Sequence, residues 1–345
     1  TYTNCKFENY YMFAGDETIV AQSTFTNEGQ YFWTGTAKNI TFNDCVFNGK
    51  ERAVKVCTVG NHADRTATFN NCQFTAETQV KSALEIDGSK GSTYTVYVNG
   101  CTATGFATSD FTGESLFNIE GAENVTVYVD GNKWAGKGLY EDSDGNPVVT
   151  SIEGLQYALD NAADGTTTIF FGKDLVGDVI VKQVEGKNIV IDGKEYNYDG
   201  TIYIWGGARY EGAETLAIKN VNFKHAEGAI DFISSNSTAP AERYAHNVTI
   251  EGCTFEGGAD AVAARFRQAF NIAIKDSEVI AGHSLAQLNG CTGVAIEGTT
   301  VKAGRGVSFG TSTDCTVLAS TFEAASYGLR ADGTIKEGSL TLTNT

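Results

Sequence analysis

Short runs in which hydrophobic and polar residues alternate recur along most of the chain, and many of them end in the same pattern. In Asn247–Phe255 the pattern is a hydrophobic residue, any residue, a hydrophobic residue, two polar or turn residues, a small residue, any residue, and Phe or Val. A period of two predicts β-strands, because successive side chains of a strand point to opposite faces. Further copies, some of them truncated or weak, lie at Thr1–Phe7, Thr18–Phe25, Ile40–Phe47, Ala67–Phe74, Val96–Ala103, Val127–Trp134, Ile189–Tyr196, Leu216–Phe223, Ile272–Val279, Val294–Val301, Cys315–Phe322 and Leu340–Thr345.

The copies are separated by gaps of unequal length. A fixed motif joined by variable gaps is typical of a solenoid, in which short strands stack in register and insertions leave the stack as loops. A second strand is expected after each motif, for example at Ala229–Phe232 and Gly306–Phe309. Two or three short strands per coil predict an all-β fold, a parallel β-helix solenoid.

The Asn-Val-Thr-Ile-x-Gly-Cys-Thr-Phe type of coil resembles the right-handed, pectate-lyase-like β-helix repeats of secreted and cell-surface proteins, a fold that phage tailspikes share. The resemblance covers most of the chain and implies a right-handed helix. It leaves the function open, because this scaffold hosts lyases, hydrolases, adhesins and structural stalks.

The motif is absent between Trp134 and Ile189, and this gap divides the chain. The acidic, Gly- and Pro-containing segment 141–149 is expected to be a linker. Residues 1–140 are then the C-terminal part of a first β-helix array, and residues 150–345 form a second array. Because the first array begins, and the second ends, within a motif, we expect a fragment of a longer tandem surface protein.

A helix is predicted over 152–163, where apolar residues recur at helical spacing. Thr150 and Glu153 fit a capping box at its start, and Asp164-Gly165 is expected to end it. A short amphipathic helix in this place would cover the open end of the second array, whose strand edges would otherwise be exposed.

Composition then removes several function classes. The chain has 42 Asp+Glu and 25 Lys+Arg, a net charge of −17, which argues against a nucleic-acid partner. No apolar stretch is long enough for a membrane helix, so no membrane insertion is expected. The 39 Gly and 2 Pro suit many tight corners between strands that need their backbone donors.

Neither the cysteines nor the acidic residues predict a metal site or a cofactor. Five of the eight cysteines occupy the small position of the motif, where a buried thiol acts as a small apolar side chain. Asp142, Asp144, Asn146 and Glu153 imitate the spacing of an EF-hand and leave calcium as an alternative. The loop has Pro147 where an EF-hand requires Gly, so a solvated linker is favoured.

Charged residues of the second array, among them Arg267, Arg305 and Asp332, supply the candidates for catalysis. The first three to test are Asp231, Arg265 and Arg330. If Ile230, Val262, Val307 and Leu329 point inward, an outward column forms, with Arg265 and Asp332 two residues further along their strands. Several coils separate Asp231 from Arg330, so the two side chains are not expected to contact the same sugar. No catalytic residue is therefore assigned. The expected column contains Asp231, Ala263, Ser308 and Arg330.

Aromatic residues gather where the motif is weakest, and flat rings with a polar end suit stacking on sugar faces. The alternative is that bulky side chains fill the core next to the helix. The predicted ligand-binding residues are Tyr196, Tyr198, Tyr203, Trp205 and Tyr210.

Together these patterns favour an extracellular or cell-surface β-helix, or a phage-particle component, that acts as a structural stalk or adhesin without catalysis. A polysaccharide or a host or bacterial glycan is the expected partner. One alternative is a polysaccharide lyase or glycoside hydrolase on the same scaffold. Another is a fibre subunit that associates with itself end to end through its coil ends.

Overall fold

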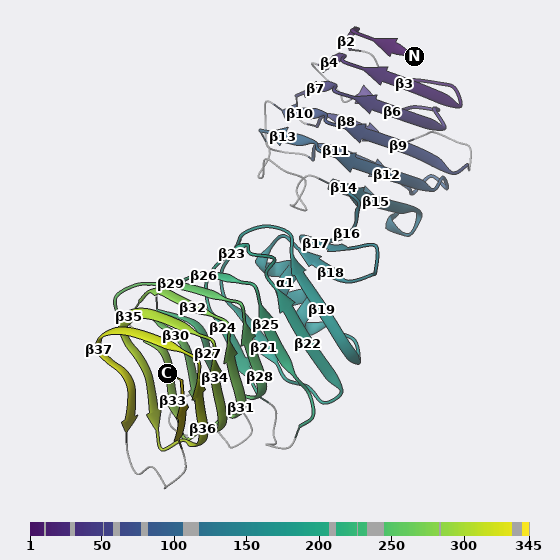
Figure 1. The fold of residues 1–345 in the computed structure, drawn as a ribbon. Helices are drawn as coiled ribbons and strands as arrows, with labels where there is room; N and C mark the ends of the chain where they lie inside the picture. Colours follow the sequence, from purple (N-terminus) through teal and green to yellow (C-terminus); the bar gives the residue numbers. More distant parts are fainter. Residues whose placement is uncertain are drawn as a thin grey trace. The chain divides into compact units, whose positions relative to one another are not determined.

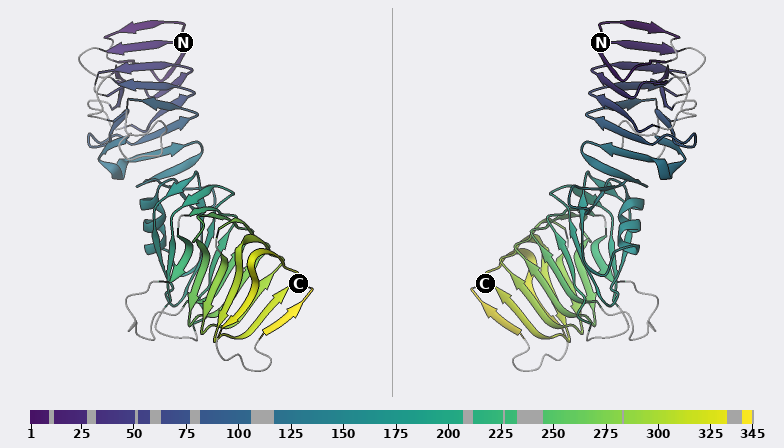
Figure 2. Two further views of the ribbon diagram at one scale, coloured as in Figure 1. Left: turned by 90° about the vertical axis from the view of Figure 1, so that its left-hand side faces the viewer. Right: turned by 90° about the vertical axis from the view of Figure 1, so that its right-hand side faces the viewer.

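The computed structural model describes residues 1–9, 12–27, 32–50, 52–57, 63–76, 82–105, 117–206, 212–225, 227–232, 245–282, 284–332 and 340–344. The chain divides into two compact units, Thr1–Gly145 and Asn146–Thr345. In both units short parallel strands stack as successive rungs (Figures 1 and 2), so the predicted parallel β-helix is confirmed. Among the described residues no helix combines the length and apolarity that crossing a membrane would take.

The first unit has three stacks of parallel strands, and the four coils from β3 to β14 contribute one strand to each stack. The first stack holds β1 (Tyr2–Thr3), β3 (Glu17–Ala21), β6 (Asn39–Asn43), β9 (Arg65–Asn70), β12 (Tyr94–Asn99) and β15 (Val125–Val129). The second holds β2 (Lys6–Glu8), β4 (Thr24–Asn27), β7 (Val46–Gly49), β10 (Gln73–Ala76) and β13 (Thr102–Thr104). The third holds β5 (Phe32–Trp33), β8 (Val54–Val56), β11 (Leu84–Asp87) and β14 (Phe117–Glu120).

The last motif copy of the first unit does not form a coil. Strands β15, β16 (Asn132–Gly136) and β17 (Leu139–Glu141) pair antiparallel, after a short 3₁₀ helix at Ala122–Asn124. The copy predicted at Val127–Trp134 is therefore a hairpin. Asp130 and Gly131, both at positive φ, make its tight turn, which sends the chain back along β15.

The second unit also has three strands in most coils. The first stack holds β18 (Pro147–Val149), β19 (Gly165–Phe171), β22 (Lys187–Asp192), β25 (Leu216–Lys219), β28 (His246–Glu251), β31 (Phe270–Lys275), β34 (Thr292–Glu297), β36 (Thr313–Leu318) and β38 (Leu340–Thr343). The second holds β20 (Leu175–Val176), β23 (Asn197–Asp199), β26 (Asn222–His225), β29 (Thr254–Gly257) and β32 (Glu278–Ala281). The third holds β21 (Val179–Lys182), β24 (Ile202–Trp205), β27 (Gly228–Phe232), β30 (Val262–Arg267) and β33 (Ser284–Asn289). The long strands β35 (Thr300–Gly310) and β37 (Thr321–Asp332) continue the second and third stacks together.

Helix α1 (Ile152–Asp160) precedes these coils, and its buried face includes Leu155 and Leu159. The predicted capping box is wrong in detail: the N-cap is Ser151, whose hydroxyl accepts a hydrogen bond from the Gly154 amide at 2.9 Å. The helix also ends earlier than predicted, with Asn161 as its C-cap. Gly165 instead begins β19.

The residue before the small position of the motif has a left-handed backbone in most coils. Asp44, Asn71 and Gly252 have φ values of 53°, 52° and 63°. Asn, Asp and Gly tolerate this conformation better than other residues, which explains why they recur at the corner. Amide side chains one position earlier also stack across coils: Asn99 Nδ2 donates to Asn70 Oδ1 at 2.9 Å, and Asn70 Nδ2 to Asn43 Oδ1 at 2.8 Å.

The small position has a second requirement that its size does not reveal. Its side chain donates to the carbonyl two residues earlier, as Cys45 Sγ does to Asn43 O at 3.3 Å and Ser277 Oγ to Lys275 O at 2.7 Å. Its oxygen or sulfur also accepts a hydrogen bond from the backbone amide of the residue at the small position of the preceding coil. The Cys253 amide, for example, donates to Ser277 Oγ at 3.2 Å. Cys, Ser and Thr share this capacity, so they alternate freely at the position.

All eight cysteines are free thiols, and most are buried. Burial raises the pKa of Cys253 to about 12 and that of Cys57 to about 11. A thiol with such a pKa is not a nucleophile near neutral pH. Cys253 and Cys57 are therefore structural thiols and not nucleophiles.

The last motif residue fills the core, and aromatic rings stack there from coil to coil. Phe25 and Phe47 are stacked with ring centroids 4.7 Å apart, and Phe47 and Phe74 with centroids 5.2 Å apart. Phe223 and Phe255 repeat the arrangement in the second unit at 5.1 Å. Each ring is fully buried, which makes these stacks a major hydrophobic contribution to each coil.

On the third stack of the first unit, Lys55, Glu85 and Asn118 lie in one cross-strand column, as the strand pattern predicts. Lys55 Nζ is 2.7 Å from Glu85 Oε1, and Arg52 forms an ion pair with the same carboxylate. The carboxylate of Glu85 is almost completely buried and is balanced by these two cations, so removing the cations would leave an uncompensated buried charge.

Candidate ligand-binding face

The third stack of the second unit aligns polar side chains of six consecutive strands on its outer face. The strands are parallel and in register, so one residue of each lies beside its equivalent in the next coil. We call this row the outer column. It consists of Tyr203, Asp231, Arg265, Gln287, Ser308 and Arg330.

The register differs from the one predicted from the sequence. Ile230 pairs with Ala264 and not with Val262, so Arg265 lies beside Asp231. Ala263, which was expected in the column, is buried. Asp332 does lie two residues beyond Arg330 on β37 and pairs with Gly310. The three residues proposed for catalysis thus share one column, although Asp231 and Arg330 are four strands apart.

Asp231 and Arg265 form an ion pair in the middle of the outer column. Arg265 Nη1 lies 3.0 Å from Asp231 Oδ2, and Arg265 Nη2 also donates to the carbonyl of Glu227 at 3.4 Å. Burial raises the pKa of the Asp231 carboxyl, against the opposing effect of the Arg265 hydrogen bond. Asp231 therefore fixes the orientation of the guanidinium, and it does so at the edge of the site described next.

A surface depression of about 660 Å³ lies beside the column, across β27, β30, β33 and β35. We call it the arginine depression, because Arg265 and Arg267 are its only charged lining residues within the described part of the chain. Its lining consists of Phe232, Arg265, Phe266, Arg267, Gln287, Leu288, Asn289, Ser308, Gly310 and Thr311.

Hydrogen-bonding groups of the depression are available to a ligand. Arg267 is exposed and has no ion pair or hydrogen bond with the described residues, and the same holds for the exposed amide of Gln287. Asn289 Oδ1 accepts a hydrogen bond from Thr311 Oγ1 at 3.4 Å, and this contact orients the Asn289 side-chain amide. The site offers the guanidinium of Arg267 and the side-chain amides of Gln287 and Asn289, groups that bind acidic and hydroxylated ligands.

The far end of the column is closed by a cation–aromatic cluster. Arg305 and Arg330 lie on Tyr327, with guanidinium carbons 5.7 and 5.5 Å from the ring centroid. Four of the eight arginines in the sequence, Arg265, Arg267, Arg305 and Arg330, thus come from β30, β35 and β37. This concentration of positive charge contrasts with the net charge of −17 of the chain.

The structure separates the aromatic residues predicted to bind a ligand. Tyr203 and Trp205 are partly exposed on the outer face of β24, next to β27. Tyr198 is fully buried and pairs with Phe223, so it is a core residue. Tyr196 is exposed in the turn before β23, and Tyr210 lies outside the described residues.

The error over Tyr198 has a local cause. The motif copy at Ile189–Tyr196 was aligned with Tyr196 at the aromatic position, but Lys194 and Glu195 both have positive φ and lengthen the corner. The core position therefore moves to Tyr198. Burial raises the pKa of the Tyr198 hydroxyl well above its usual range, consistent with a side chain closed off from solvent.

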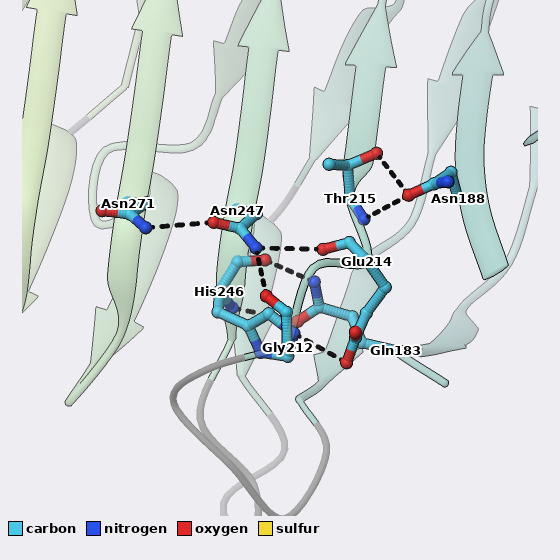
Figure 3. A network of polar contacts seen from close by, with 8 residues as sticks. All are labelled: Gln183, Asn188, Gly212, Glu214, Thr215, His246, Asn247 and Asn271. Carbon is cyan, nitrogen blue, oxygen red and sulfur yellow. Dashed lines mark hydrogen bonds and ion pairs between the residues drawn. The ribbon is translucent and has the colours of Figure 1, made fainter. Parts of the chain in front are cut away.

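A second polar cluster of this unit, shown in Figure 3, is buried at its centre, where Gln183, Glu214 and His246 meet. His246 Nε2 lies 2.9 Å from Glu214 Oε1, and the Gln183 side chain bonds both backbone groups of His246. Asn247 Nδ2 donates to the carbonyls of Gly212 and Glu214. These bonds join β28 to the segments after β21 and before β25. The cluster is 1% exposed at His246, so it is a structural clamp and not an open site.

No group of three or more potential metal ligands occurs among the described residues. The acidic segment with the EF-hand-like spacing forms a turn, in which Asp142 Oδ1 accepts from the Asp144 amide at 2.9 Å. The Asp142 side chain thus stabilises the turn in which it lies.

No family model and no curated protein matches the chain. Among solved structures, the crystal structure of tailspike protein 3 of bacteriophage CBA120 matches with a TM-score of 0.22 and 10% sequence identity. The match covers 100% of this chain and 56% of that one, so the chain spans little more than half of the tailspike. The functional argument therefore depends on the geometry of the outer face.

Proposed function

We propose that the second unit binds an anionic glycan at the arginine depression without cleaving it, as part of a stalk or adhesin at a cell surface or on a phage particle. The observation that carries this proposal is the lining of the depression: two arginines and no carboxylate among the described lining residues, in a chain with a net charge of −17.

The chemistry of the lining supports an acidic sugar as the ligand. A guanidinium donates two parallel hydrogen bonds to a carboxylate or sulfate, and such charge-assisted bonds are among the strongest in proteins. The Arg267 guanidinium makes no hydrogen bond or ion pair with the described residues, so its donors can serve a ligand. The amides of Gln287 and Asn289 suit sugar hydroxyls, and Tyr203, which lies beside Asp231 in the register, provides an aromatic ring on the same face.

Among the described residues, no acid lines the arginine depression, and this favours binding over hydrolysis. Glycoside hydrolases generally use two carboxylates that flank the scissile bond. Asp231 is paired with Arg265, and none of the described lining residues is Asp or Glu. The raised pKa of Asp231 is nevertheless what a general acid requires. A polysaccharide lyase or hydrolase is therefore the second candidate function, with Asp231, Arg265 and Arg330 as its residues.

The proposal is tested by measuring the binding of polygalacturonate, chondroitin sulfate and uncharged dextran to the whole chain. Arg267→Ala should weaken binding of an acidic polymer about 10- to 100-fold, the loss of one charge-assisted hydrogen bond. Lys302→Ala is the matched control, since it removes one exposed positive charge from the second stack of the same unit. Equal effects of the two variants, or binding of dextran alone, would refute the proposal.

A reducing-end assay on the same mixtures separates binding from cleavage. The proposal expects no product from any of the polymers. Release of reducing ends or unsaturated sugars that Asp231→Asn abolishes would establish the enzymatic alternative in its place. Self-association through coil ends stays a separate prediction, which light scattering of the intact chain tests.

A further inference from the structure

We infer that Asp231 sets the number of charges that the arginine depression recognises. It neutralises Arg265 and leaves Arg267 as the only net positive charge of the lining within the described part of the chain. This inference rests on the proposed function and names the residue that limits the affinity of the site for acidic ligands.

Arg265 is bound to the segment that carries Asp231 and is not free to follow a ligand. Its Nη1 lies 3.0 Å from Asp231 Oδ2, and its Nη2 donates to the carbonyl of Glu227 at 3.4 Å. Gly228 makes room for this position, because a Cβ there would lie 3.1 Å from Arg265 Nη1. Both terminal nitrogens of the guanidinium thus have partners on β27 or immediately before it.

The Asp231 carboxylate is held in place independently of Arg265. Its Oδ1 accepts a hydrogen bond from the Phe232 amide at 2.8 Å, which leaves Oδ2 for the guanidinium. The Asp231 side chain is only 19% exposed, so breaking the ion pair would leave a largely buried charge without compensation. An acidic ligand therefore gains little at Arg265, because it exchanges one ion pair for another and leaves Asp231 uncompensated.

Arg267 lies two residues further along β30 and has different neighbours. Residues two apart on a strand point to the same face, and the register places Asn289 and then Gly310 beside Arg267. The next residue of this row is Asp332, three strands from Arg267. On the β33 side, then, the described residue next to Arg267 is neutral, and an acidic ligand group has no carboxylate to displace there.

The distance between the two charges gives the size of the effect. Asp231 and Arg267 are one strand spacing and two residues apart, which corresponds to roughly 8 Å. At this separation a unit charge changes the affinity for another by about 2- to 30-fold, between the dielectric constant of water and that of a protein surface. Removing the Asp231 charge should therefore tighten the binding of an acidic group at Arg267 by a factor in this range.

Binding of polygalacturonate to the whole chain over a series of salt concentrations tests the inference. Asp231→Asn, which keeps the size of the side chain, should bind about 2- to 30-fold more tightly than the wild-type chain. Each ion pair with a highly charged polymer releases about one counterion, so the slope of log K against log salt should steepen by about one as Arg265 becomes available. Glu297→Gln removes one exposed negative charge from the first stack, controls for net charge and should change neither quantity.

A second pair of variants separates charge balance from direct contact. Arg265→Gln should weaken binding, because it leaves the Asp231 charge uncompensated, and adding Asp231→Asn to it should recover most of that loss. The double variant has no unpaired charge at this place, so it keeps the test valid if Asp231→Asn alone does not fold.

The outcomes distinguish this inference from the proposed function. If the wild-type chain does not bind polygalacturonate, or Arg267→Ala does not weaken the binding, the proposed function itself fails. If binding depends on Arg267 but Asp231→Asn leaves both affinity and salt slope unchanged, the depression binds acidic ligands and the role of Asp231 is wrong. A double variant that binds as weakly as Arg265→Gln would show direct contact of Arg265 with the ligand and would also overturn the inference.

Discussion

Lowering the pH from 7 to 5 should destabilise the second unit through His225. This side chain is 6% exposed, packs edge-on against Phe255, and neither ring nitrogen has a hydrogen-bond partner among the described residues. Burial lowers the pKa of His225 from 6.5 to about 4, and the charge of Arg265 adds to the effect. The folded unit therefore holds this imidazole neutral.

The size of the effect follows from proton linkage. The unfolded chain takes up a proton at His225 near pH 6.5, whereas the folded chain does so only near pH 4. Unfolding is therefore coupled to proton uptake between these values, and stability falls as the pH falls through them. The loss is about 2 kcal/mol at pH 5 and about 3 kcal/mol at pH 4, and it levels off near its limit of about 3.4 kcal/mol at still lower pH.

Urea unfolding at pH 7 and pH 5 measures this loss, with peptides of β26–β30 followed by hydrogen-exchange mass spectrometry so that the second unit is observed separately. His225→Leu replaces the imidazole with a side chain that does not titrate. The wild-type chain should lose about 2 kcal/mol more than the variant between the two pH values. If both lose the same amount, His225 is not the buried neutral group described here.

Three further predictions concern the coils. Ser277→Ala should cost about 1–3 kcal/mol in urea unfolding, because the buried Cys253 amide loses its acceptor, and Ser277→Cys should recover most of this; equal costs would contradict the hydrogen-bonding role of the small position. Glu214→Leu should lower stability by about 1–3 kcal/mol by leaving His246 without its partner, with Glu214→Gln less affected, and a thermal melt showing no difference between them would argue against the clamp. Phe47→Ala should cost about 3–5 kcal/mol in the first unit, measured by hydrogen exchange, and a loss confined to the second unit would be inconsistent with the described stack.

Local sequence patterns predicted the coils well because each coil repeats the same physical requirements. Alternation fixes which residues enter the core, and the final Phe of the motif stacks on its equivalents. Asn, Asp and Gly mark the left-handed corner. The hydrogen-bonding role of the small position was missed, although the exchange of Cys for Ser and Thr was visible in the sequence and is the signal that could have revealed it.

The candidate site was harder to predict because it depends on register between strands whose connecting segments vary in length. Aligning Ile230 with Val262 instead of Ala264 moved Arg265 two residues away from Asp231. Two residues with positive φ before Tyr196 shifted the core position to Tyr198. Arg267 is one of the charged candidates of the second array, but it was placed neither in the expected column nor among the first residues to test, since nothing in the local pattern shows that it borders a depression.

A crystal structure of the whole chain with a bound acidic octasaccharide tests the central claim most directly. The account predicts a carboxylate or sulfate oxygen within hydrogen-bond distance of the Arg267 guanidinium, with the sugar to which it belongs in the arginine depression. A ligand bound on the stack that contains β28 and β31, or one that leaves Arg267 without contact, would contradict it.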